Sequence, residues 1–171
     1  ADIFNLTAAE VNNFVGVKVG DINGTAAANF TMEAATRSNE NLEFVVAENA
    51  MTTGETYTID FLAKDFNDVY GFQHTLNLTN VEFVSVESGA LNVTENNFGL
   101  NANGGVAVSV DIAQGANVAD DAVLFSINVK ALANTNVSDA VNMTSTAIAA
   151  EAYVGRDLEI LGSEVVFRTN N

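Results

Sequence analysis

The chain has 171 residues, of which 22 are acidic and 6 are basic, so its formal net charge at pH 7 is -16. This charge excludes nucleic acid as a partner, because proteins that bind nucleic acid need a basic surface against the phosphates. The absence of cysteine excludes disulfides and thiolate metal sites. No apolar run reaches the length of about 18 residues that marks a membrane-spanning helix, so we predict no membrane insertion.

The first 41 residues are predicted to lie outside the main domain. Residues 14–19 (FVGVKV) have the pattern of a strand, and residues 20–24 (GDING) that of a turn. We interpret residues 1–25 as the C-terminal remnant of a preceding module whose earlier part we expect upstream of Ala1. Residues 26–41 are rich in Ala, Thr, Ser and Asn without a sustained period, which predicts a linker.

Residues 42–171 are predicted to form one all-β domain. Its organising stretch runs from Tyr57 to Gly89, where apolar side chains recur at every second position from Tyr57 to Ala63 and again in residues 72–78. This period of two is typical of strands with one buried face. Residues 42–47 precede the stretch as a further strand, and residues 81–87 complete it.

The second half of the domain continues with short strands. They are predicted at residues 106–111, 123–130, 143–153 and 158–167, the third with a bulge or short helical turn near residues 149–151. Residues 90–105 are predicted as a long loop that Leu91, Phe98 and Leu100 anchor to the core, and residues 114–121 as a polar connection. Short strands at this spacing, with turn signals between them, favour a β-sandwich or jelly roll.

A calcium loop is one interpretation of the turn near the N-terminus. Asp21, Asn23 and Thr25 occupy what would be positions 1, 3 and 5 of such a loop, where oxygen ligands are needed. However, Ala26 and Met32 stand where that loop requires glycine at position 6 and a carboxylate at position 12. The preferred interpretation is a glycine-assisted turn, and the alternative is a Ca²⁺ ion completed by carboxylates from elsewhere.

Two further groups of acidic residues are also candidates for binding Ca²⁺. Asp65 and Asp68 flank one predicted turn, and Asp120 and Asp121 form the only adjacent acidic pair of the main domain. Either group supplies oxygen ligands for Ca²⁺. Because Asp and Asn make turns readily without a metal, solvated turns are the preferred interpretation.

The sequence predicts no enzyme. His74 is the single histidine, and it falls on the apolar row of residues 72–78 rather than beside a nucleophile. A triad needs a serine or cysteine partner in hydrogen-bond reach of such a base, and paired carboxylates across a cleft are not recognisable among the scattered acids. We therefore predict that His74 packs in the core or at an edge.

Three aromatic residues near loops are candidates for stacking on sugars: Tyr70, Phe98 and Tyr153. Each is equally suited to closing one end of a sandwich. The core interpretation is preferred, because the chain has 11 phenylalanines and no tryptophan, the ring best suited to a sugar platform.

Several segments resemble a known family. Residues 42–167 resemble cohesin-like domains, above all in the segments GETYTIDFLAKDF, GFQHTLNL, VEFVSVESGALNVTENNFGLN, VLFSINVKAL and IAAEAYVGRDLEILGSEVVF. Cohesin-like domains are jelly-roll β-sandwiches of bacterial carbohydrate-degrading assemblies and of large surface proteins. The resemblance implies the same fold, and cohesins bind dockerin modules through one sheet face.

A second resemblance concerns the N-terminal segment. FVGVKVGDINGTA, residues 14–26, is similar to the sequence that follows a dockerin-like calcium module in bacterial proteins of the type IX secretion route. Together the two resemblances imply an extracellular or cell-surface protein in which this chain is a non-catalytic structural or adhesion module of a large exported surface or filament protein, in contact with other modules or with copies of itself. The alternative is a carbohydrate-binding accessory domain of a secreted glycan-degrading enzyme.

Overall fold

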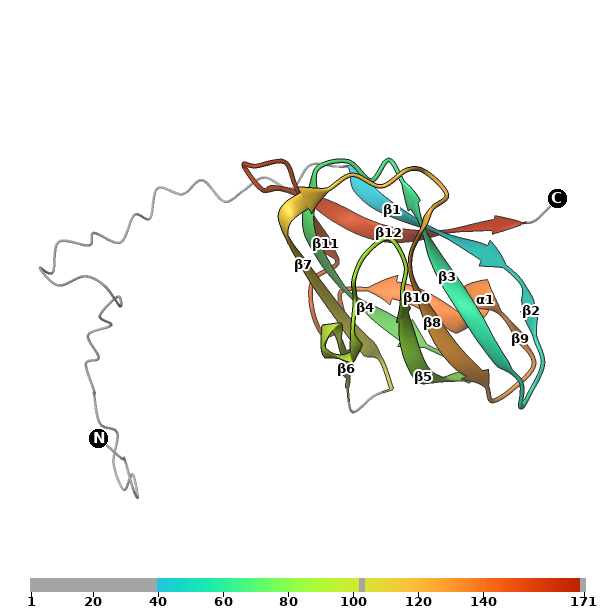
Figure 1. The fold of residues 1–171 in the computed structure, drawn as a ribbon. Helices are drawn as coiled ribbons and strands as arrows, with labels where there is room; N and C mark the ends of the chain where they lie inside the picture. The colour runs from blue at the N-terminus through green and yellow to red at the C-terminus, as the bar shows by residue number, and fades with distance from the viewer. Residues whose placement is uncertain (1–39, 102–103, 170–171) are drawn as a thin grey trace, which may run out of the picture. The chain divides into compact units, whose positions relative to one another are not determined.

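The computed structural model describes residues 40–101 and 104–169, which form a β-sandwich (Figure 1). The elements in chain order are β1 (Asn41–Glu48), β2 (Ala50–Met51), β3 (Thr56–Lys64), β4 (Val69–Leu78), β5 (Val81–Ser88), the 3₁₀ turn η1 (Glu95–Asn97), β6 (Phe98–Leu100), β7 (Val106–Ala116), β8 (Val123–Ala131), β9 (Thr135–Asn136), α1 (Val137–Ala140), β10 (Val141–Thr144), β11 (Glu151–Val154) and β12 (Glu159–Thr169). The predicted all-β jelly-roll class is confirmed.

The two layers of the sandwich are parts of one curled sheet. One layer has the order β5–β8–β3–β1–β12, and the other has the order β11–β4–β7–β6, with β10 also paired to β4. Strand β12 joins them, because its first residues pair with β11 and its remainder pairs in parallel with β1. The sandwich is therefore closed by hydrogen bonds along β12 and open between its edge strands β5 and β6.

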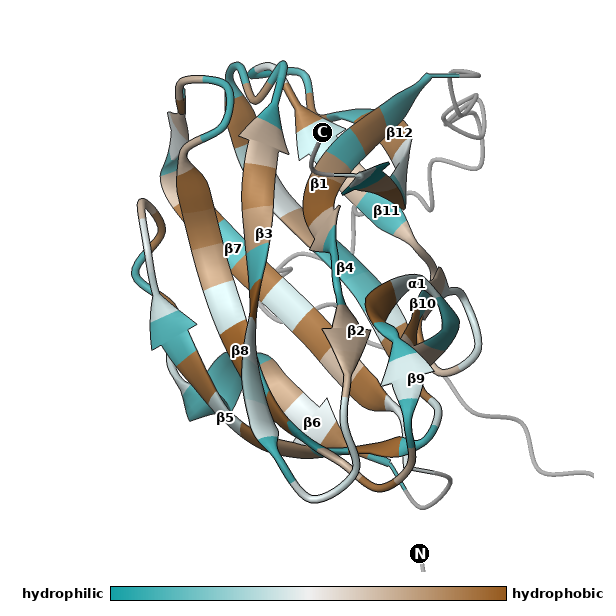
Figure 2. Ribbon diagram, turned by 90° about the vertical axis from the view of Figure 1, so that its right-hand side faces the viewer, coloured by the Kyte–Doolittle hydropathy of each residue, from teal (hydrophilic) through white to brown (hydrophobic). Residues whose placement is uncertain are grey.

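The core is built from the alternating side chains of both layers. Phe61 and Phe125 stack with ring centroids 4.7 Å apart, and Phe44 meets Phe72 edge-on at 5.0 Å. All four phenylalanines are fully buried. Figure 2 shows the corresponding bands of hydrophobic and hydrophilic residues along the strands, so the predicted period-two pattern is confirmed.

The predicted loop over residues 90–105 is only partly correct. It contains η1 and the short edge strand β6, and Leu91 is buried as expected. Phe98 points to the core, where its ring lies 5.7 Å from that of Phe125. Leu100, in contrast, is 68% exposed, because it ends the edge strand where the other layer no longer covers it. Val93, which the pattern did not single out, is buried instead.

The single strand predicted over residues 143–153, with a bulge or short helical turn near residues 149–151, is wrong, because residues 145–150 separate two strands. These strands are β10 and β11, which pair with different halves of β4. At the break the hydroxyl oxygen of Thr75, on β4, accepts the backbone N–H groups of Ala147 at 3.0 Å and Ile148 at 3.2 Å. The predicted polar connection also begins later than expected, because β7 continues to Ala116.

Candidate docking surface on the β11–β4–β7 face

The outer surface of the β11–β4–β7 layer follows from strand register. Gly71 of β4 pairs with Tyr153 on one side and with Asp111 on the other. The next residues along each strand, including the buried Phe72 and Ala152, point into the core. Tyr153, Gly71 and Asp111 therefore form one row across the outside of this sheet.

This face carries a shallow depression of about 400 Å³. Glycine and small residues form its floor, and larger apolar side chains stand around it. The lining residues are Tyr70, Gly71, Phe72, Gln73, Ser109, Val110, Asp111, Ile112, Ala113, Tyr153 and Leu158. An apolar hollow with a few polar groups at its margin suits a protruding side chain of a partner or a small ligand.

Each of the two tyrosines at the depression lies against a glycine. A Cβ atom on Gly71 would lie 2.7 Å from the carbonyl oxygen of Val110, so only glycine fits between the strands here. Tyr153 lies beside that glycine, and its hydroxyl donates to Glu151 Oε2 at 3.1 Å. Tyr70 lies in the bulge of β4, and its ring covers Gly115, whose φ of +68° is unfavourable for other residues.

Besides Tyr70 and Tyr153, the turn between β11 and β12 contributes an apolar side chain to the margin of the depression. Figure 1 shows this turn near the C-terminal end of β7. The turn is held by two hydrogen bonds: Gly155 N–H donates to the carbonyl oxygen of Asp68 at 2.8 Å, and Leu158 N–H donates to that of Gly155 at 3.0 Å. The side chain of Leu158 is 50% exposed at the tip.

The structure thus separates the three predicted aromatic candidates. Tyr70 and Tyr153 come together in the depression, whereas Phe98 belongs to the core. Leu158 and Ile112 were not predicted as site residues, because a single apolar residue in a turn or at a strand end carries no periodic signal.

The outer face of the other layer is different in character. Its side chains bond one another across the strands: Thr58 donates to Asn128 at 2.6 Å, and Ser126 donates to Asp60 at 2.6 Å. The amide of Asn128 continues this row to Ser85 and Glu87 on β5. A partner would have to displace these bonds, which makes this face the less suitable docking surface.

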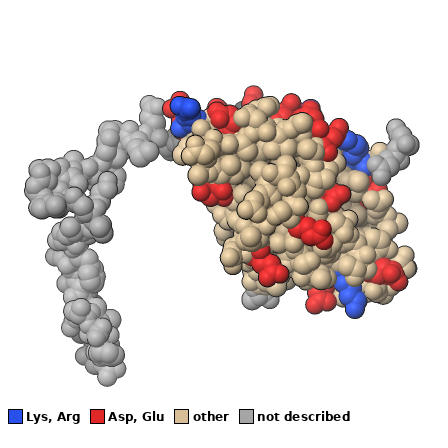
Figure 3. All heavy atoms as spheres, in the orientation of Figure 1, with Lys and Arg blue, Asp and Glu red and all other residues tan. Residues whose placement is uncertain are grey.

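The four predicted acidic loop residues lie in the β3–β4 and β7–β8 loops, which a hydrogen bond between Asp65 and Asp120 brings together. Figure 3 shows several acidic side chains along the top of the view. Asp120 accepts the backbone N–H of Asp65 at 2.8 Å, and this bond, with the nearby Lys64, lowers the pKa of Asp120. The pKa of Lys64 is raised, mainly by the side-chain hydrogen bond from Lys64 to Asp65 and further by the negative charge of Asp120.

Three of the four aspartates, Asp65, Asp120 and Asp121, form ion pairs with basic side chains. Lys64 lies 3.0 Å from Asp65 and 3.4 Å from Asp120, and Arg168 lies 2.7 Å from Asp121. Asp65, Asp68 and Asp121 all have positive φ, as residues of tight turns do. In the described part of the chain no group of three or more His, Cys, Asp and Glu side chains is placed to hold a metal ion.

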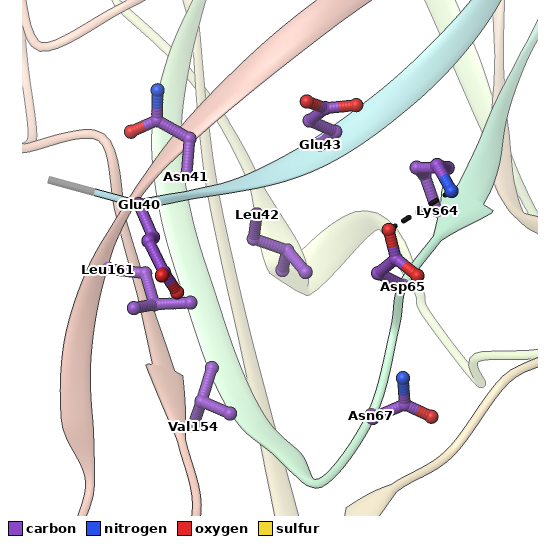
Figure 4. Close-up of a pocket in the computed structure, with 9 residues that line it drawn as sticks. All are labelled: Glu40, Asn41, Leu42, Glu43, Lys64, Asp65, Asn67, Val154 and Leu161. Carbon is purple, nitrogen blue, oxygen red and sulfur yellow. Dashed lines mark ion pairs between the residues drawn. The ribbon is translucent and has the colours of Figure 1, made fainter. Parts of the chain in front are cut away.

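A recess of about 370 Å³ lies beside these loops (Figure 4). Leu42, Val154 and Leu161 give it an apolar floor, and Glu40, Glu43 and the Lys64–Asp65 pair stand at its margin. The Lys64–Asp65 ion pair, at 3.0 Å, lies at one side of the recess.

His74 is fully buried between the layers, as predicted. Its ring lies 5.5 Å from that of Phe44 and stacks on Phe72 at 5.8 Å. Neither ring nitrogen has a hydrogen-bond partner. Burial lowers the pKa of His74 from the ordinary 6.5 to about 3, because a charged imidazole would be desolvated there. A neutral side chain sealed from solvent is a core residue and not a catalytic base.

The calcium-loop candidates Asp21, Asn23 and Thr25 lie outside the described residues, as do residues 1–25 and nearly all of the predicted linker. Among the residues that the structure does describe, no helix is long and apolar enough to span a membrane.

No protein-family model matches this sequence, and no curated protein matches it significantly. Solved structures match it in fold. A cohesin from the OlpC type I cohesin–dockerin complex of Clostridium thermocellum aligns with a TM-score of 0.54 and 14% identity, over 81% of this chain and 99% of that chain. A type II cohesin from the cellulosome of Acetivibrio cellulolyticus aligns with a TM-score of 0.52 and 12% identity, over 75% and 92%.

A second Clostridium thermocellum cohesin, from the OlpA complex with a dockerin, aligns with a TM-score of 0.50 and 10% identity, over 74% of this chain and all of that one. These alignments span nearly the whole length of each cohesin. The described domain therefore has the cohesin-like jelly-roll fold.

Proposed function

We propose that this chain is a non-catalytic protein-binding domain of the cohesin type that binds its partner with the β11–β4–β7 face. The observation that carries the proposal is the apolar depression between Tyr153 and Leu158 on the outer face of this sheet. Partly buried tyrosines and a half-exposed leucine around a hollow have the composition of protein-binding hot spots. The similar folds in cohesin–dockerin complexes support a dockerin-like module as the partner.

We further propose that the domain works outside the cell, as a structural or adhesion module of a large exported surface or filament protein. The resemblance of residues 14–26 to the sequence after dockerin-like modules supports this context. In the same context Asp21, Asn23 and Thr25 would contribute to a Ca²⁺ site together with carboxylates from elsewhere in the protein.

The test is a binding measurement with purified dockerin modules, including those of the two Clostridium thermocellum complexes, by isothermal titration calorimetry with and without Ca²⁺. We expect at least one module to bind wild-type protein, and Tyr153→Ala to weaken that binding about tenfold or more. Thr58→Ala, on the other outer face, is the matched control and should bind as the wild type does. Light scattering on the protein alone tests self-association. Absence of binding across the panel, with a monomer in solution, would count against the proposal.

A carbohydrate-binding role is the second candidate, because Tyr70 and Tyr153 line the same depression. Aromatic rings beside a hollow stack on sugar rings. Binding to a polysaccharide that is lost in both Tyr70→Ala and Tyr153→Ala would favour it, whereas failure across a broad glycan panel would remove it.

A further inference from the structure

Leu158 differs from every comparable residue of the described chain. Five residues other than glycine have positive φ there: Asp65, Asp68, Asn80, Asp121 and Leu158. Aspartate and asparagine tolerate this left-handed conformation, but a leucine at φ +54° is strained. Such strain persists where the surrounding structure enforces it, and it is concentrated at functional sites.

The strain at Leu158 is not compensated by burial. Its side chain is 50% exposed and lines the depression beside Tyr153. The turn that holds it is fixed at Gly155, whose N–H donates to the carbonyl oxygen of Asp68. A leucine held in an unfavourable conformation with half of its surface in solvent is not accounted for by folding alone.

The depression also has a defined electrostatic surrounding. Asp111 lines it, Tyr153 donates to the Glu151 carboxylate, and Asp157 and Glu159 flank Leu158 in the chain. Arg156 is the one basic residue of this turn. These four carboxylates outnumber the one guanidinium, so the face repels acidic partners and favours basic ones.

The backbone limits how a partner can bind. Strand β4 forms the floor and is paired with β11 on one side and with β7 on the other. No strand can be added there, so recognition must use side chains, as when a helix or loop is laid on a sheet face.

Building on the proposed function, we infer that Leu158 determines which partner the face accepts. The Leu158 and Tyr153 side chains receive an aliphatic side chain of a protein partner, and the surrounding carboxylates select a partner that carries lysine or arginine next to it. The occupant is a basic protein module rather than a neutral glycan.

The first experiment uses three leucine derivatives as probes, titrated into ¹⁵N-labelled protein and followed by NMR. Leucinamide is cationic, N-acetylleucinamide is neutral and N-acetylleucine is anionic. We expect saturable shifts at Gly71, Asp111 and Leu158 with leucinamide, and binding of N-acetylleucine at least about fivefold weaker at low salt. Equal shifts from all three probes, or shifts spread over other surfaces, would overturn the inference.

The second experiment compares two leucine variants. Leu158→Asn suits the left-handed backbone and removes the apolar side chain, whereas Leu132→Asn changes a leucine that is 57% exposed at a distant turn. We expect Leu158→Asn to lower leucinamide binding at least about fivefold while its melting temperature stays level or rises. Leu132→Asn should bind as the wild type does. Unchanged binding in Leu158→Asn would overturn the inference.

These outcomes separate the two proposals. If a dockerin module binds wild type and Leu158→Asn equally well, the role of Leu158 is wrong but the docking face stands. If leucinamide binds at the depression and no protein module does, the proposed function fails while the site remains.

Discussion

Tyr153 lies beside Gly71, its pairing partner on the neighbouring strand, with the tyrosine Cδ2 atom 3.8 Å from the position of a Cβ atom on residue 71. Because Gly71 has no side chain, its backbone forms part of the floor of the depression, and the ring of Tyr153 forms one wall. The candidate docking surface therefore depends on strand register, which places an aromatic residue next to a glycine.

Gly71→Ala should destabilise the domain by about 1–3 kcal/mol, because the new methyl group meets the Val110 carbonyl oxygen at 2.7 Å. Chemical denaturation measures the change. Gly99→Ala is the matched control, since the nearest atoms to a Cβ there lie 4.0 Å away, and it should alter the free energy of unfolding by no more than about 0.5 kcal/mol. Equal effects of the two substitutions would contradict the strand geometry at Gly71.

His74 should make the domain less stable in acid. Its pKa is about 3 in the folded protein and 6.5 in the unfolded chain, so below pH 6.5 the unfolded chain binds a proton that the folded protein does not. The free energy of unfolding should then fall by up to about 1.4 kcal/mol per pH unit until pH approaches 3. Denaturant unfolding at several pH values measures this dependence.

The carboxylates also titrate in this range, so the contribution of His74 is read from a variant. His74→Leu removes the imidazole and its unpaired nitrogens, and its free energy of unfolding should decline less between pH 6.5 and 4 than that of wild type. At pH 8 the variant should be about as stable as wild type or more so, since no buried polar group is left unsatisfied. The same pH dependence in both proteins would show that His74 does not contribute.

Phe83 and Phe98 should stabilise the open side of the sandwich as a pair. They come from the edge strands β5 and β6, and their rings stack with centroids 6.1 Å apart. Phe98→Ala should cost roughly 2–4 kcal/mol, and a double-mutant cycle with Phe83→Ala should give a coupling of about 0.5–1.5 kcal/mol. Leu100→Ala, on the same strand but exposed, should change stability by less than about 0.5 kcal/mol. A coupling near zero would mean that the two rings act independently.

Asp120 should hold the β3–β4 loop in place through its hydrogen bond more than through its charge. Asp120→Ala removes both the bond to the Asp65 N–H and the ion pair with Lys64, and it should lower the melting temperature. Asp120→Asn keeps an acceptor oxygen and should lower it less, with little dependence on salt. Equal losses in the two variants, abolished by high salt, would instead assign the effect to charge.

The sequence alone determined the fold class and most of the core. Alternation in residues 57–63 and 72–78 is set by the strand period, so the face turned to the core could be recognised without coordinates. In residues 123–129 the same pattern placed Phe125, Ile127 and Val129 in the core, but it did not predict that Leu124, on the opposite face, is fully buried as well. The same pattern placed His74 inside. It did not place Leu100, because exposure at the end of an edge strand depends on where the opposite layer stops. It also merged β10 and β11, because the Thr75 hydroxyl that accepts the Ala147 and Ile148 N–H groups lies far away in the chain.

Only the tertiary structure decided the candidate site. Tyr70 and Tyr153 are remote in sequence and meet because β4 and β11 are neighbours, while Phe98 turns to the core because β6 is paired with β7. Leu158 carries no sequence signal at all, since its significance lies in a backbone angle and in its exposure. Local pattern fixes which face of a strand is buried, but strand order and turn geometry decide which exposed residues share one surface.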